Sequence, residues 1–228
     1  MKSDAKQAAR ARRKPRARFH HGDLRAATLE VATRVVDGGG AEAVSVREIA
    51  RALGVSDPAI YRHFDSREAL LREVGLEGLG RAMAEVTAAL AAADSPEARL
   101  CAAGCGYLRY AVAHPHWFRL FASRGFQDEV WPRPSAGPNA KVDPDDVPEP
   151  FRTAVHAEHA MKDALGVLVP EDEVDDQYRI LWALAHGLAG LVVERLFRRV
   201  ETDAERLTVA ERAIALQVET LRRAARAR

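Results

Sequence analysis

The chain has 228 residues, 47% of them hydrophobic and 29% charged, which is enough to bury a core in one large domain or two modest ones. No apolar run reaches the roughly 18 residues of a membrane span. The basic N-terminus lacks the apolar segment of a secretory signal. These features exclude a membrane partner and predict a cytoplasmic protein.

The net charge of +1 conceals an asymmetry along the chain. Residues 1–72 carry 15 Lys and Arg against 9 Asp and Glu, a net charge of +6, whereas residues 73–228 have a net charge of −5. The excess begins in residues 1–18, which contain one acid, Asp4, and show no apolar face. We expect a disordered basic arm there, which either follows DNA phosphates or merely solubilises the chain. Only the first third is expected to meet a polyanion.

Residues 19–67 predict three short helices. The first spans about 22–37 and ends at three successive glycines, Gly38 to Gly40. Ser45 and Glu48 then have the spacing of a capping box, which starts a second helix. Ser56 with Pro58 marks the start of a third helix. The unit is too small to be strongly stable alone.

The spacing of Ala50, Gly54 and Ile60 is the informative part of this stretch. A small residue permits close helix crossing, the glycine turns the corner, and the apolar residue fixes the second helix onto the first. This pattern is typical of a helix-turn-helix. The alternative is an ordinary helical hairpin in an all-α protein.

Residues 68–228 predict a second, all-α domain. Helices are expected from about 66 to 90, from about 95 onwards, after Pro115, and over 150–168, with a flexible Pro-, Gly- and Asp-rich loop at 127–149. Gly75, Gly78 and Gly80 interrupt the first of these, which indicates either a pivoting connector or close packing of a neighbour.

The last two helices show long apolar repeats, over 174–196 and 207–221. They have more apolar surface than a monomer needs, which predicts a homodimer through these helices.

The motifs S-x-x-E-I-A, L-G-V-S and Y-x-H-F, at residues 45–50, 53–56 and 61–64, resemble the N-terminal domain of the TetR family of transcriptional regulators. The likeness covers about residues 24–72. The stretches HPHWFRLF and LWALAHGLAGL, with FHHGDLR at the start, resemble a ligand-domain subgroup named for its Trp, His and Gly, here Trp182, His186 and Gly187.

This resemblance implies a dimeric repressor, less often an activator, that binds a palindromic double-stranded DNA operator until an unidentified small-molecule effector releases it. The positions that contact bases and phosphates in the family fall on Ser45, Arg47, Pro58, Ala59, Tyr61, His63 and Arg67.

Two positions depart from the family's usual residues. Asp57 is acidic, so it either caps the helix, accepts from a cytosine amino group, or excludes wrong sequences. Arg62, often aromatic in relatives, adds a phosphate contact. Elementary physics supports Arg47 as a bidentate fork for guanine and Tyr61 as a phosphate donor. Tyr61 could otherwise be a core tyrosine.

The effector is expected between helices of the second domain, in a mainly apolar site. The candidate lining residues, which core packing alone would also explain, are Tyr107, Trp117, Phe118, Phe121, Met161, Trp182 and His186.

Three other functions compete with this one. An enzyme is disfavoured, because no G-x-S-x-G, P-loop or H-E-x-x-H occurs. The pairs His156 with His159 and His114 with His116 leave a metal sensor open, although no metal or cofactor is expected. A structural DNA-bundling protein would need little of the aromatic second domain.

Overall fold

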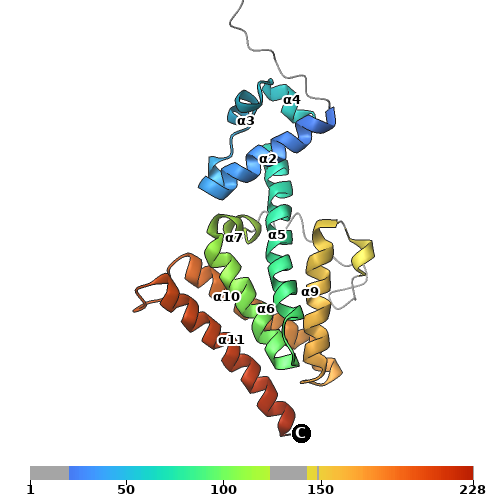
Figure 1. Ribbon diagram of the computed structural model, residues 1–228, viewed down its shortest axis with the longest axis vertical. Coiled ribbons are helices and arrows are strands. Elements are labelled where there is room, and N and C mark those ends of the chain that lie inside the picture. Colours follow the sequence, from blue (N-terminus) through green and yellow to red (C-terminus); the bar gives the residue numbers. More distant parts are fainter. Residues whose placement is uncertain (1–20, 124–142, 148, 228) are drawn as a thin grey trace, which may run out of the picture. The chain divides into compact units, whose positions relative to one another are not determined.

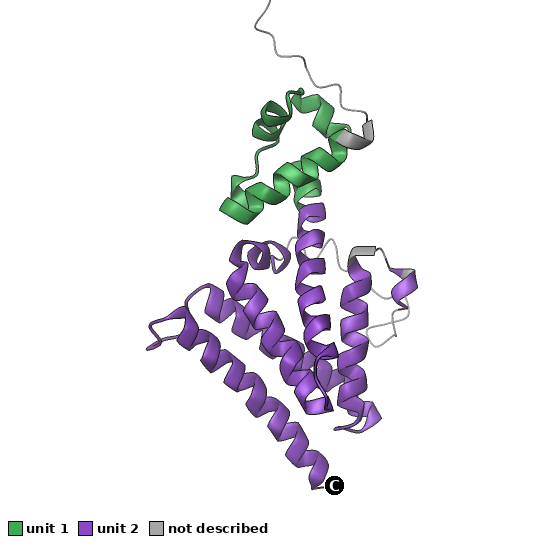
Figure 2. Cartoon of the chain, in the orientation of Figure 1, with its two compact units in different colours: residues 1–71 green, residues 72–228 purple. Residues whose placement is uncertain are grey.

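The computed structural model describes residues 21–123, 143–147 and 149–227. The regular structure in these ranges is helical, which confirms the predicted all-α class (Figure 1). The chain divides into two compact units, residues 1–71 and 72–228 (Figure 2). The sequence prediction put the change of domain between residues 67 and 68, and both boundaries fall at the start of one helix, α5 (Arg67–Ala91). The predicted arm, residues 1–18, lies outside the described residues.

The first unit starts with α2 (His21–Gly39), which packs against the following 3-10 turn η1 (Ala41–Ala43) and against α3 (Val46–Leu53). The helix runs through Gly38 and Gly39, slightly beyond its predicted end. It stops at Gly40, whose φ of 77° lies in the left-handed region that favours glycine.

The turn between α3 and α4 (Asp57–Tyr61) confirms the predicted helix-turn-helix. The Ser45 hydroxyl accepts from the backbone N–H of Glu48 at 3.4 Å, whereas the Glu48 carboxylate pairs with Arg51, so the predicted capping box forms in one direction. Gly54 takes the left-handed conformation, with φ 70°. Ile60 is fully buried and attaches α4 to the rest of the unit.

In the described residues, the second unit contains the rest of α5 and the elements that follow it. They are α6 (Pro96–Ala113), α7 (Pro115–Phe121), α9 (Glu149–Gly166), the 3-10 turn η3 (Glu171–Glu173), α10 (Val174–Val193) and α11 (Asp203–Arg226), with a short turn η2 (Pro144–Asp146) before α9. α6 packs against α9, α10 and α11 and runs between α11 and α5 (Figure 1). Part of the predicted loop 127–149 lies outside the described residues. Its end is ordered, because η2 is followed by buried Val147 and α9 begins at Glu149.

The predicted glycine-interrupted helix is continuous in the structure, and close packing accounts for Gly78. A Cβ atom at this position would lie 2.4 Å from Cε3 of the buried Trp117 ring. The Tyr110 hydroxyl also donates to the Gly78 carbonyl at 3.1 Å. By contrast, a Cβ on Gly80 would meet open space. The aromatic helix α7 therefore packs directly on the backbone of α5.

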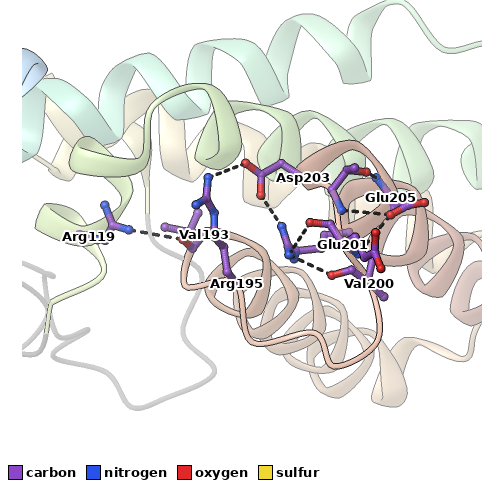
Figure 3. A network of polar contacts seen from close by, with 9 residues as sticks. Arg119, Val193, Arg195, Val200, Glu201, Asp203 and Glu205 are labelled. Atoms are coloured by element: carbon purple, nitrogen blue, oxygen red, sulfur yellow. Dashed lines mark hydrogen bonds and ion pairs between the residues drawn. The ribbon is translucent and has the colours of Figure 1, made fainter.

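The connection between α10 and α11 corrects one prediction. The expected helix continued to Leu196, but α10 ends at Val193, Arg195 has φ 55°, and the Leu196 side chain is 62% exposed. Hydrogen bonds and ion pairs hold the chain after the helix ends (Figure 3). The Arg206 guanidinium donates to the carbonyls of Val200 and Glu201, both at 2.9 Å.

Asp203 adds two contacts to this network (Figure 3). Asp203 accepts from Arg206 at 2.6 Å and from Arg195 at 3.0 Å, and the pKa of Asp203 is lowered chiefly by the hydrogen bond from Arg195. Thr202 and Glu205 form a capping box at the start of α11. The loop is thereby fixed by hydrogen bonds after the helix has ended at Val193.

Candidate DNA-binding surface and internal cavity

The α3–α4 turn of the first unit presents a polar surface, which we call the reading surface. It consists of the exposed side chains of Arg47, Pro58, Tyr61 and Arg62. Tyr61 follows fully buried Ile60 directly and is 46% exposed, so the structure does not support the alternative of a core tyrosine. Because α4 has only five residues, its outward side chains all belong to the N-terminal part of a recognition helix, which reaches base edges.

The other predicted contact residues of this turn are less exposed. Ser45, Asp57, Ala59 and His63 are half-buried. Ser45 caps α3, and Asp57 occupies the first turn of α4, where an acidic side chain stabilises the helix dipole. Asp57 therefore has a local structural role that does not depend on a cytosine.

Arg67, also among the predicted DNA contacts, has a guanidinium that backbone carbonyls already bind. Its Nε donates to Val44 O at 2.8 Å and its Nη2 to Ala41 O at 2.6 Å. These bonds join the start of α5 to the segment that leads into α3. Sequence reasoning missed this role, because residues 23 and 26 positions apart share no local pattern.

The second unit contains a partly open cavity of about 330 Å³. Its wall comes from α5, α6, α7, α9, α10 and one residue of α11, and it is mostly aliphatic and aromatic. The apolar part includes Leu79, Met83, Val86, Leu100, Ala103, Phe121, Ala154, Ala157, Met161, Leu181, Trp182, Ala185 and Ile214.

One hydrogen-bonded pair in the cavity wall, Tyr107 and His186, forms what we call the Tyr–His dyad. The Tyr107 hydroxyl and His186 Nδ1 lie 2.8 Å apart, and the residues come from α6 and α10. Burial raises the pKa of the Tyr107 hydroxyl and lowers the pKa of the His186 imidazole. Both shifts disfavour the charged form, so the dyad is neutral near pH 7.

Comparisons with known proteins agree with this arrangement. The family model described as "Bacterial regulatory proteins, tetR family" matches residues 29–74. A second model, "Tetracyclin repressor-like, C-terminal domain", matches residues 100–216, more than half of the chain. The chain belongs to the TetR family. It is accordingly a DNA-binding transcriptional regulator and not an enzyme.

Solved structures of the same fold extend over most of this TetR family chain. A protein of unknown function from Rhodococcus sp. RHA1 is 25% identical with a TM-score of 0.56, covering 88% of this chain and 97% of its own. The TetR family regulator PfmR from Thermus thermophilus is 22% identical with a TM-score of 0.53, covering 84% and 97%. A putative transcriptional regulator from Streptomyces coelicolor A3(2) is 19% identical with a TM-score of 0.56, covering 91% and 98%. No curated protein sequence matches the chain.

Most of the residues that were predicted to line the effector site of this TetR family protein do line the cavity. Tyr107, Phe121, Met161, Trp182 and His186 are in its wall, and Trp182 is 49% exposed although it was expected on an inner face.

The remaining two predicted residues are buried in the adjoining aromatic cluster. The Phe118 ring lies 5.4 Å from the His186 ring and 6.3 Å from the Tyr107 ring. Trp117 packs on Gly78 instead. They support the dyad and α5 from behind the wall.

Sequence reasoning missed a charged group next to the cavity wall. Lys162 Nζ lies 2.7 Å from Glu158 and 2.7 Å from Asp175. Burial opposes the charge of this amine, but the hydrogen bonds to Asp175 and Glu158 raise the pKa of Lys162 overall. Glu158 lines the cavity, as does Tyr178, whose hydroxyl donates to it. The spacing of Glu158 and Lys162, four apart on α9, was the available signal.

The histidine pairs form no metal site in the part of the chain that the structure describes, where no group of three or more His, Cys, Asp or Glu side chains could hold an ion. His156 is exposed on α9. Cys101 and Cys105 are free thiols on α6, and burial raises the pKa of Cys105 to about 11, so this thiol is unreactive near neutral pH. No described helix is long and apolar enough to span a membrane.

Proposed function

We propose that this TetR family protein is a homodimeric repressor that leaves a palindromic operator when a small molecule occupies its cavity. The observation that carries the proposal is the division of roles between the units. One unit presents an exposed arginine and tyrosine surface on a helix-turn-helix, and the other contains a mainly apolar cavity. Such a regulator acts on chromosomal DNA, so we expect it in the cytoplasm.

The operator contacts are proposed on the first unit. Arg47 is suited to reading a guanine through its two-pronged guanidinium, and Tyr61 and Arg62 to fixing register on phosphates. The full proposed set is Ser45, Arg47, Asp57, Pro58, Ala59, Tyr61, Arg62, His63 and Arg67. For Arg67 the carbonyl contacts favour a supporting role over a phosphate contact.

Dimerisation is proposed through α10 and α11. Large apolar side chains are exposed on both helices and support this proposal; they include Ile180, Leu191, Val209 and Leu216. Pairing two helices from each chain into a bundle would cover them. Two reading surfaces would then face two half-sites about 34 Å apart.

Release requires that the effector prefer one conformation of the dimer. A compound that bound both states equally well would shift nothing, however tight its binding. We propose that filling the cavity favours a state whose reading surfaces no longer match successive major grooves.

The test begins by selecting operator duplexes from a random library with the full-length protein. We expect inverted repeats and a complex containing two 25.0 kDa chains. Arg47→Ala should weaken binding by about 1–3 kcal/mol and relax the preference at one base pair. Arg34→Ala removes an exposed arginine of α2 and serves as the charge-matched control. Direct repeats, a single bound chain, or equal losses in both variants would contradict the proposal.

A further inference from the structure

We infer that the effector is an uncharged, largely apolar molecule with one carbonyl or hydroxyl oxygen, which the Tyr107–His186 dyad binds. This inference rests on the proposed function of the cavity and specifies the chemistry that the cavity recognises. It follows from three properties of the wall: its apolar lining, the saturation of its charges, and the hydrogen-bonding capacity left on the dyad.

Charges in the wall are already compensated. Among the described residues that line the cavity, Glu158 and Arg179 are the charged ones. Glu158 lies 2.7 Å from Lys162 Nζ, and Arg179 lies 2.6 Å from Asp176. A carboxylate would have to share Arg179 with Asp176, and an amine would have to share Glu158 with Lys162, so neither finds an uncompensated counter-charge in this mainly apolar site. The wall therefore discriminates against carboxylates and amines alike.

The dyad offers one hydrogen for a ligand in either of its tautomers. If the Tyr107 hydroxyl donates to Nδ1, the imidazole carries its hydrogen on Nε2, which is then the free donor. If Nδ1–H donates to the tyrosine oxygen, the phenolic hydrogen is free instead. In both cases one N–H or O–H remains, and an acceptor oxygen on the ligand can satisfy it.

The surroundings of the dyad keep it neutral and in place. The Phe118 and Phe121 rings lie 6.3 and 6.5 Å from the Tyr107 ring, and the Trp182 ring stacks on the imidazole at 5.1 Å. This apolar setting holds the pKa of His186 below its ordinary value, so the imidazole does not act as a cation toward a carboxylate ligand. The remaining hydrogen is a specific feature in an otherwise apolar wall.

The experiment titrates the full-length protein with octyl methyl ketone, nonanoate and octylamine, three probes that share an octyl chain, and measures binding by calorimetry. We expect the ketone to bind at least about tenfold more tightly than either charged probe near pH 7. Tighter binding of nonanoate or octylamine would overturn the inference, and so would the absence of binding by all three.

Two variants assign the preference to the dyad. Tyr107→Phe combined with His186→Leu removes both polar groups and keeps two apolar side chains, so ketone binding should weaken about tenfold. Thr220→Val removes an exposed hydroxyl of α11 that is not in the cavity wall and should leave ketone binding unchanged. Equal effects of the two variants would overturn the role of the dyad. If the double variant does not fold, the ranking of the three probes on the unmodified protein still decides the inference.

A second measurement separates this inference from the proposed function. The ketone is added to the complex of protein and selected operator, and bound DNA is followed. Ketone binding without DNA release would leave the inference standing and contradict the release mechanism. Release by nonanoate or octylamine, with the ketone inactive, would support the release mechanism and contradict the inference about the effector.

Discussion

Tyr61 and Tyr107 show how differently the two units use the same side chain. Tyr61 lies on a five-residue helix, directly after a buried isoleucine, and its side chain is exposed. Tyr107 lies in the middle of an eighteen-residue helix, and its hydroxyl is bonded to an imidazole from another helix. A side chain presented outward suits a large polyanion, whereas an inward one suits a small ligand.

The contacts that hold these two sites in place involve different lengths of the chain. The reading surface rests on a short segment of chain, closed by the bonds from Arg67 to the Ala41 and Val44 carbonyls. The cavity depends on side chains from six helices, and on Trp117 seated against Gly78. Damage to the first support should stay in the first unit, and damage to the second should alter the cavity without altering the outward residues.

The largest effect is expected from Gly78→Ala. The added methyl group would lie within 2.4 Å of the buried Trp117 ring, and overpacking of this kind costs about 1–3 kcal/mol. Gly80→Ala is the matched control, because its methyl group meets open space and should stabilise the helix by up to about 1 kcal/mol. Urea unfolding of both variants measures the difference. A loss of stability of the same size at both positions would show that α5 tolerates no side chain here for another reason.

The next effect, confined to the first unit and no larger than the first, is expected from Arg67→Ala. Removing two hydrogen bonds from a charged group to carbonyls should cost about 1–3 kcal/mol. Arg67→Lys retains the charge but cannot bridge both carbonyls, so it should lose most of the same stability. The measurement is the unfolding free energy together with the salt dependence of DNA binding. If lysine restored both fully, Arg67 would be a phosphate contact and not a support.

The contrast between the units also explains what the sequence could predict. The helix-turn-helix is encoded by residues within about twenty positions of one another, so Ser45, Gly54 and Ile60 each took their predicted places. Five of the seven residues expected in the cavity also line it, although Trp182 does so with its side chain half exposed.

Pairings between distant helices were not predictable in the same way. The contact between Tyr107 and His186 joins residues 79 positions apart, and no periodicity specifies it. The packing of Trp117 on Gly78 could not be predicted either, since a glycine in the sequence indicates only that another group can approach its backbone closely. The end of α10 was missed because the apolar repeat continues past Val193, while the left-handed Arg195 is set by polar contacts of the loop.

The smallest effect we predict is a pH dependence of the second unit that originates in His186. Burial lowers the pKa of this imidazole in the folded protein, so the unfolded chain binds its proton more readily. Because stability rises with pH wherever the unfolded state holds more protons, the His186 contribution is full above the unfolded pKa of about 6.5 and is lost progressively as the pH falls below it.

His186→Asn retains a polar partner for Tyr107 but does not titrate. Thermal unfolding from about pH 7.5 to about pH 5.5 should therefore show a shallower decline in the variant than in the unmodified protein. Parallel declines would mean that the imidazole is as accessible to protons in the folded chain as in the unfolded one, and the cavity would then be open to water on the side of the dyad.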